Sequence, residues 1–147
     1  MLPMIVADTN VILRGVRSHE GACGFVLKGM LRGEIAFAAT PAVIFEYEDV
    51  LKRNGIMGSS PITHGQIDAI LDALCSRAVE AHPFFRFRPF LVDPKDDLFI
   101  ECALAANARL IVTDDGHFRD PVVTAFGLRP VTAKDFVQEL RYGRTPK

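Results

Sequence analysis

Short apolar segments that each end at an acidic residue constrain the fold of this chain most strongly. The three clearest are residues 5–7 before Asp8, residues 90–92 before Asp93, and residues 110–112 before Thr113-Asp114-Asp115. Fully apolar runs of this length are typical of strands buried on both faces of a parallel sheet. Ligands of an open α/β sheet bind outside the carboxyl ends of its strands, so these acids can converge there. Carboxylates suit hard divalent cations such as Mg²⁺ and Mn²⁺, and a metal site is therefore expected.

Helical patterns alternate with these strands along the chain. Strands are expected at residues 4–7, 35–37, 110–113 and 129–131, with another ending at Val92; helices are expected at residues 20–32, 41–53, 64–79, 93–107 and from residue 133 onward. Three of the helices begin at a capping threonine, namely Thr40 before Pro41, Thr63 with Gln66, and Thr132 with Asp135. The pattern predicts an α/β fold with a central, mainly parallel sheet.

The length and charge of the chain limit its organisation. With 147 residues, of which 49% are hydrophobic, the chain can build one domain with a real core but not two comfortable ones. We expect a single domain over residues 1–140 and a basic, frayed tail over residues 141–147. The formal net charge is −1, so binding of a polyanion would require a local basic patch or a bound cation.

The cysteines and the hydropathy indicate the compartment. Cys23, Cys75 and Cys102 form no C-x-x-C pair and fall in predicted helices, which favours buried, reduced thiols. No segment approaches the roughly 18 apolar residues that a membrane span needs, and no basic leader precedes an apolar run. A cytoplasmic protein with no membrane association is expected.

Individual acids also have structural explanations. Asp8 can be the N-cap of the following helix as readily as a ligand. In the helix at residues 41–53, Glu46 and Glu48 lie on opposite rims of the apolar face. Geometry alone does not decide which of the two belongs to the site. Asp93, Asp96 and Asp97 crowd one helix start, where a single aspartate would suffice as a cap. Asp114 and Asp115 raise the same question after the strand at residues 110–113.

Other kinds of site have little support. The four histidines show no zinc-ligand spacing, although His117 lies near the acids, and the motifs of a P-loop, a nucleophile elbow and a dinucleotide fingerprint are all missing from the sequence. The segment Phe84–Phe90 interleaves arginine with phenylalanine. That pattern fits a surface for single-stranded nucleic acid or, more simply, an edge strand.

Four segments in order resemble the PIN domain. They are V-A-D-T-N-V at residues 6–11, P-A-V-I-F-E-Y-E-D-V-L at residues 41–51, D-P-K-D-D at residues 93–97 and V-T-D-D at residues 112–115. The resemblance covers nearly the whole chain and is greatest to small prokaryotic VapC-type toxins. It implies a three-layer α/β/α sandwich and a metal-dependent ribonuclease.

The resemblance also assigns residues to the site. The acids of the PIN domain fall on Asp8, Glu46 and Asp115, with Thr113 in support. The resemblance thus selects Glu46 rather than Glu48. The third acid is Asp96 by alignment of the D-P-x-D segment or Asp97 by counting back from Asp115, and we lead with Asp96. The implied metal ligands for Mg²⁺ or Mn²⁺ are Asp8, Asp96 and Asp115; the supporting residues are Asn10, Thr113, Asp93, Asp97 and Asp114.

The expected substrate is RNA, and a cognate antitoxin and a second copy of the chain are the candidate protein partners. Two alternatives remain open. A PIN-like module can bind RNA or a partner without cleaving, and a response-regulator-like receiver also gathers acids at strand ends. The receiver lacks support because no lysine stands at the end of a strand after residues 110–113, and Lys134 precedes a helix instead.

Overall fold

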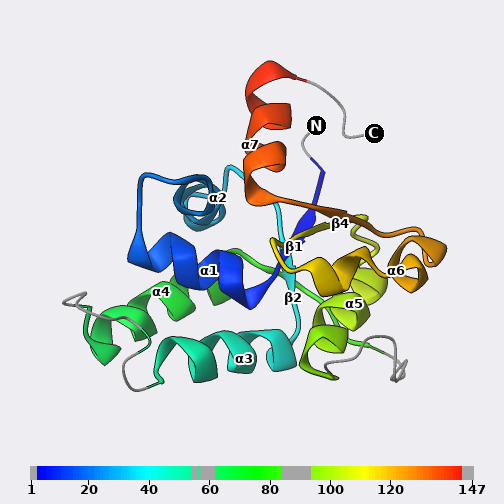
Figure 1. Cartoon of the computed structure of the whole chain (residues 1–147). Helices are drawn as coiled ribbons and strands as arrows, with labels where there is room; N and C mark the ends of the chain where they lie inside the picture. The colour runs from blue at the N-terminus through cyan, green and yellow to red at the C-terminus, as the bar shows by residue number, and fades with distance from the viewer. Residues whose placement is uncertain (1–2, 54–55, 57–61, 84–93, 144–147) are drawn as a thin grey trace.

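A computed structural model describes residues 3–53, 56, 62–83 and 94–143 (Figure 1). The strands are β1 (Ile5–Ala7), β2 (Ala38–Ala39), β3 (Val79–Glu80), β4 (Leu110–Val112) and β5 (Arg129–Val131). The helices are α1 (Thr9–Arg17), α2 (Ala22–Leu31), α3 (Pro41–Leu51), α4 (His64–Arg77), α5 (Pro94–Ala106), the 3₁₀ helix η1 (Gly116–Arg119), α6 (Pro121–Ala125) and α7 (Ala133–Tyr142).

A central parallel sheet confirms the predicted α/β class. β4 lies between β1 and β5, and the register pairs Val6 with Ile111 and Ile111 with Pro130. β2 and β3 form a second parallel pair, which a bridge between Ile5 and Phe37 joins to β1. The strands therefore follow the spatial order β3-β2-β1-β4-β5. All residues of β1 and β4 are buried, as their apolar sequences predict.

Helices cover both sides of this sheet. Figure 1 shows α1, α2 and α4 on one side of the strands, and α5 and α6 on the other. Right-handed crossovers explain this division, because the chain moves from β1 to β3 in one direction and from β3 through β4 to β5 in the other. α5 packs directly on β1, β2 and β4, which brings its N-terminal turn close to the ends of the central strands.

The helix starts agree with the capping signals in the sequence. The Thr40 side chain accepts from the Val43 N–H (3.1 Å), and the Thr63 and Gln66 side chains form the predicted reciprocal capping box. α3 is also tied to the end of β1, because the buried Tyr47 hydroxyl donates to the Ala7 carbonyl. This contact fixes α3 beside the residue that follows β1, which is Asp8.

Several predicted boundaries were wrong. α4 stops at Arg77, because Ala78 takes an extended backbone and Val79 begins β3, where its N–H donates to the Phe37 carbonyl (2.8 Å). The strand expected at residues 35–37 is displaced to Ala38–Ala39, since the Ile35 N–H still closes the turn after α2.

Cys23 and Cys102 are buried free thiols, whereas Cys75 is exposed on α4.

Some predictions concern residues outside the described parts of the chain. These are the strand ending at Val92, the segment Phe84–Phe90 and Asp93. The predicted tail at residues 141–147 begins within α7, and residues 144–147 are outside the description. Within the described residues, no helix has the length and apolar character needed to cross a membrane.

Candidate metal centre

The candidate site lies where the direction of strand order reverses. Asp8 directly follows β1, and Thr113, Asp114 and Asp115 directly follow its parallel neighbour β4. From β1 the chain runs outward to β2 and β3, and from β4 it runs the opposite way to β5. A crevice forms at such a switch point outside the carboxyl ends of the strands. The sheet topology thus brings together acids that are more than a hundred residues apart.

Asp8 occupies the N-cap position of α1 but does not act as a side-chain cap. Its backbone N–H donates to the Val112 carbonyl (3.0 Å), which continues the β1–β4 pairing by one residue. Its side chain forms no capping hydrogen bond to α1 and instead accepts from Thr113 Oγ1 (2.8 Å). The carboxyl group is therefore directed to the end of β4. Capping does not explain why an acid stands here.

Thr113 connects the two strand ends. Its side-chain oxygen donates to Asp8 Oδ2 (2.8 Å) and accepts from the Asp115 backbone N–H (3.0 Å). Both Asp8 and Thr113 are buried, at 3% and 4% exposure. A β-branched side chain has few rotamers, so this pair of bonds fixes the Asp8 carboxylate and the backbone of Asp115 relative to each other.

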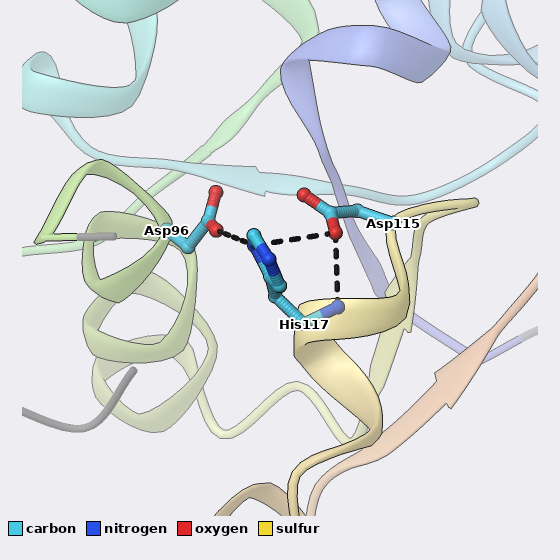
Figure 2. A group of neighbouring side chains, drawn as sticks. All are labelled: Asp96, Asp115 and His117. Atoms are coloured by element: carbon cyan, nitrogen blue, oxygen red, sulfur yellow. Dashed lines mark hydrogen bonds and ion pairs between the residues drawn. The ribbon is translucent and has the colours of Figure 1, made fainter. Parts of the chain in front are cut away.

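A second group of side chains continues the site towards α5 (Figure 2). His117 Nδ1 lies 3.4 Å from Asp96 Oδ2 and 3.5 Å from Asp115 Oδ1. The Asp115 side chain also caps η1 by accepting from the His117 backbone N–H (2.9 Å). Asp96 comes from the first turn of α5, and Asp115 and His117 come from the segment after β4.

The electrostatics link Asp8 to the same group. Burial is the main reason why the pKa of Asp8 is raised from 3.8 to about 6. The Thr113 hydrogen bond lowers it, whereas the negative charges of Asp96 and Asp115 raise it further. Asp8 therefore lies close enough to Asp96 and Asp115 for their negative charges to raise its pKa. In the absence of a cation, Asp8 keeps its proton to a higher pH than an ordinary aspartate does.

The donor set fits a divalent cation. One ligand atom from each of Asp96, Asp115 and His117 lies within 4.8 Å of the other two, so the three side chains could hold one ion together. Asp8 adds a buried carboxylate whose pKa is raised mainly by burial and further by the negative charges of Asp96 and Asp115. A divalent cation at this point would offset those negative charges.

The neighbouring acids are used differently. Asp114 accepts from Arg14 Nη1 (3.0 Å) and from the Ala133 N–H at the start of α7 (3.3 Å), so it ties β4 to α1 and α7. Asp97 is fully buried, whereas Asp96 is the member of the pair that approaches His117. Asn10 is exposed on α1. Glu101, which sequence reasoning did not single out, is also buried on α5.

The two glutamates of α3 have separate environments. Glu48 pairs with Lys52 (3.0 Å), which also pairs with Asp68 of α4 (2.6 Å). Glu46 is half-buried on the opposite flank of the helix. Among the described residues, no hydrogen bond or ion pair joins Glu46 to the other acids. Glu48 thus takes part in the ion pairs that join α3 to α4, whereas Glu46 forms no ion pair among the described residues.

His117 is the member of the group that the sequence placed near the acids but did not identify as a ligand. It belongs to no pair of residues with zinc-ligand spacing. The available signal was its position two residues after Asp115, because a turn that caps on an aspartate brings the residue at this spacing back towards the carboxylate.

Comparison with known proteins agrees with this arrangement. No match was found among curated proteins. Among protein families, the chain matches the PIN domain over residues 4–117, a range that includes β1, β4 and all the acids described above. PIN domains are in general nucleases that need a divalent metal ion, as an acidic site at strand ends would suggest. The extent of the match shows that the chain belongs to the PIN domain family.

Proposed function

We propose that this PIN domain is an endoribonuclease that uses Mg²⁺ or Mn²⁺ to hydrolyse phosphodiester bonds of RNA. One observation carries the proposal: carboxylates from the ends of β1 and β4 and from the start of α5 meet at the switch point of the sheet. Asp8, Asp96 and Asp115 would hold the ion, and Glu46 would complete the acidic set. When bound, such an ion activates a water for attack on phosphorus and offsets charge on the leaving oxygen.

The chain's own residues prepare the site for this chemistry. Thr113 holds Asp8 in one orientation, and its bond to the Asp115 N–H positions the turn that presents Asp115. The cap from Asp115 to the His117 N–H then fixes the start of η1. Such preorganised supporting bonds are what keep ligands in a productive arrangement. Thr113 is therefore a positioning residue in this account.

A cleft beside the acids supports an RNA substrate. It has a volume of about 1100 Å³ and is lined by Thr113 and Asp115 together with residues of β5 and α7, which include Asp135 and Glu139. Arg119 and Arg129 also line it, and Arg129 lies 3.6 Å from Glu139. Within the described part of the chain, the Arg119 side chain has neither a hydrogen bond nor an ion pair. Its guanidinium is available to a phosphate next to the one that is cleaved.

Arg119→Ala is expected to weaken RNA binding. Loss of one phosphate contact should raise the Kd about five- to tenfold near 0.1 M salt and reduce the salt slope of log K by roughly 0.7. Fluorescence anisotropy with a labelled single strand, in an Asp96→Asn background that prevents cleavage, measures both quantities. Arg32→Ala, at an exposed position at the end of α2, is the control. Equal RNA binding by the two variants would show that Arg119 does not contact the RNA.

We assign the protein to the VapC-type toxins, as a single domain over residues 1–140 that acts in the cytoplasm. The order of its four acidic segments supports this assignment. A cognate antitoxin and a second copy of the chain would be its protein partners. Induced expression should then arrest growth, and Asp115→Asn should abolish the arrest.

Incubation with labelled RNA tests the proposed activity. Cleavage should occur with Mn²⁺ or Mg²⁺, vanish in EDTA and return when the ion is restored in excess, because the acids alone carry only negative charge. Cleavage that persists undiminished in EDTA would contradict the proposal. RNA that is bound but never cut, in any divalent ion, would indicate a non-cleaving RNA-binding module instead.

A further inference from the structure

We propose that the imidazole of His117 is itself a metal ligand, and that it gives the site a preference for Mn²⁺ and later first-row ions over Mg²⁺. The inference rests on the metal site of the proposed function and goes beyond its set of carboxylates. It starts from a group of three side chains, Asp96, Asp115 and His117, drawn in Figure 2.

The distances suit shared coordination better than direct hydrogen bonding. His117 Nδ1 lies 3.4 Å from Asp96 Oδ2 and 3.5 Å from Asp115 Oδ1. A charge-assisted N–H···O bond is usually about 2.7–2.9 Å long, so neither contact is a strong one. Ligands held at about 2.0–2.2 Å from one ion lie roughly 3–4 Å from each other. The nitrogen stands at that separation from an oxygen of each acid.

The fold places the ring there through contacts that do not involve a metal. The His117 backbone N–H is fixed by Asp115 Oδ1 (2.9 Å). The next residue, Phe118, is fully buried and packs edge-to-face on Phe99 of α5, with ring centroids 6.3 Å apart. η1 is thus anchored to α5, the helix that carries Asp96. The ring lies between the two acids as a consequence of this packing.

The side chain is also accessible. The His117 side chain is 56% exposed, whereas those of Asp96 and Asp115 are 12% and 25% exposed. An ion entering from solvent meets the imidazole together with the exposed edges of the two carboxylates. A histidine that served only to fill the core would be buried instead.

Ligand chemistry gives the expected selectivity. Mg²⁺ is a hard ion that prefers oxygen ligands and keeps several of its waters, so a nitrogen adds little to its binding. Affinity of a nitrogen-containing site rises along the first-row series from Mn²⁺ towards Cu²⁺. One imidazole among carboxylates should therefore strengthen the binding of Mn²⁺ and Co²⁺ more than that of Mg²⁺.

Calorimetric titration without RNA tests this selectivity. His117→Asn should weaken Mn²⁺ binding about tenfold or more, by analogy with the 10–100-fold losses seen at supporting residues. Mg²⁺ binding should change by less than about threefold. His64→Asn, an exposed histidine at the start of α4, is the matched control and should leave both affinities unchanged. Thermal melting of each variant without metal shows whether it is folded, and His117→Gln is the second variant if His117→Asn is not.

Pulsed electron spin resonance of the Mn²⁺-loaded protein tests the bond itself. The wild type should show modulation from a directly coordinated ¹⁴N nucleus, and His117→Asn should lose it. A wild type that binds Mn²⁺ without this modulation, with the same Mn²⁺/Mg²⁺ ratio in His117→Asn, would overturn the inference and leave the carboxylate site intact. A wild type that binds neither ion would instead overturn the metal site of the proposed function.

Discussion

Asp96→Asn is expected to remove nearly all RNA cleavage, whereas Asp97→Asn should retain much of it. Asp96 approaches His117 Nδ1 (3.4 Å) and raises the pKa of Asp8, so its carboxylate belongs to the acidic group. Loss of a direct metal ligand should cost more than about 100-fold in rate, since supporting residues alone typically cost 10–100-fold. For Asp97→Asn we expect a loss of about tenfold or less.

Rates for the two variants must refer to folded protein. Asp97 is fully buried, so its replacement can lower stability without touching the chemistry. Melting curves recorded with each rate measurement separate these effects. If Asp97→Asn were inactive while folded, and Asp96→Asn remained active, the third acid would be Asp97.

Asp8→Asn is expected to stabilise the metal-free protein and to blunt its response to Mn²⁺. The pKa of Asp8 is about 6 in the folded chain against 3.8 as a reference, so the native state holds its proton more tightly. The stability that this proton provides is complete below pH 4 and is lost as the pH rises through 6. The loss amounts to about 3 kcal/mol at neutral pH, which a neutral asparagine avoids.

Thermal melting between pH 4 and pH 8, with and without Mn²⁺, measures this effect. For a domain of this size, about 3 kcal/mol corresponds to a difference of roughly 6–12 °C in Tm at neutral pH. The wild type should gain about 2.7 kcal/mol at a hundredfold excess of Mn²⁺ over its Kd, and the variant should gain less. Asp49→Asn, an exposed acid paired with Arg53, is the control. A variant that melts below wild type without metal and responds equally to Mn²⁺ would make Asp8 a structural residue.

The sequence was sufficient to predict β1, β4 and α5, which carry or precede Asp8, Thr113 and Asp96, but not η1, which carries His117. β1 and β4 were predictable because fully apolar triplets between helical patterns have few alternatives in a domain of this size. The starts of α3 and α4 were predictable because Thr40 and Thr63 satisfy local N–H groups. β2 and β3 were harder, since each has only two residues and their pairing depends on contacts between distant segments.

The roles of single acids depended on where the backbone directs each side chain. Asp8 had an N-cap position and a capping residue type, yet its carboxylate bonds Thr113, a residue 105 positions away. Asp114 and Asp115 are adjacent in sequence, but one joins Arg14 and the other caps η1. His117 enters the site only because η1 packs on α5. Such choices arise from tertiary contacts, which a local pattern does not contain.

The most direct test of the central claim compares wild type with Asp115→Asn on one labelled single-stranded RNA in Mn²⁺, each purified in the same way. Asparagine can still accept the His117 N–H, so the turn at η1 is preserved while a charged ligand is lost. We predict Mn²⁺-dependent cleavage by the wild type and a rate at least about 100-fold lower for the variant. Equal cleavage by the two proteins would contradict the account, because the nuclease activity would then not arise from this site.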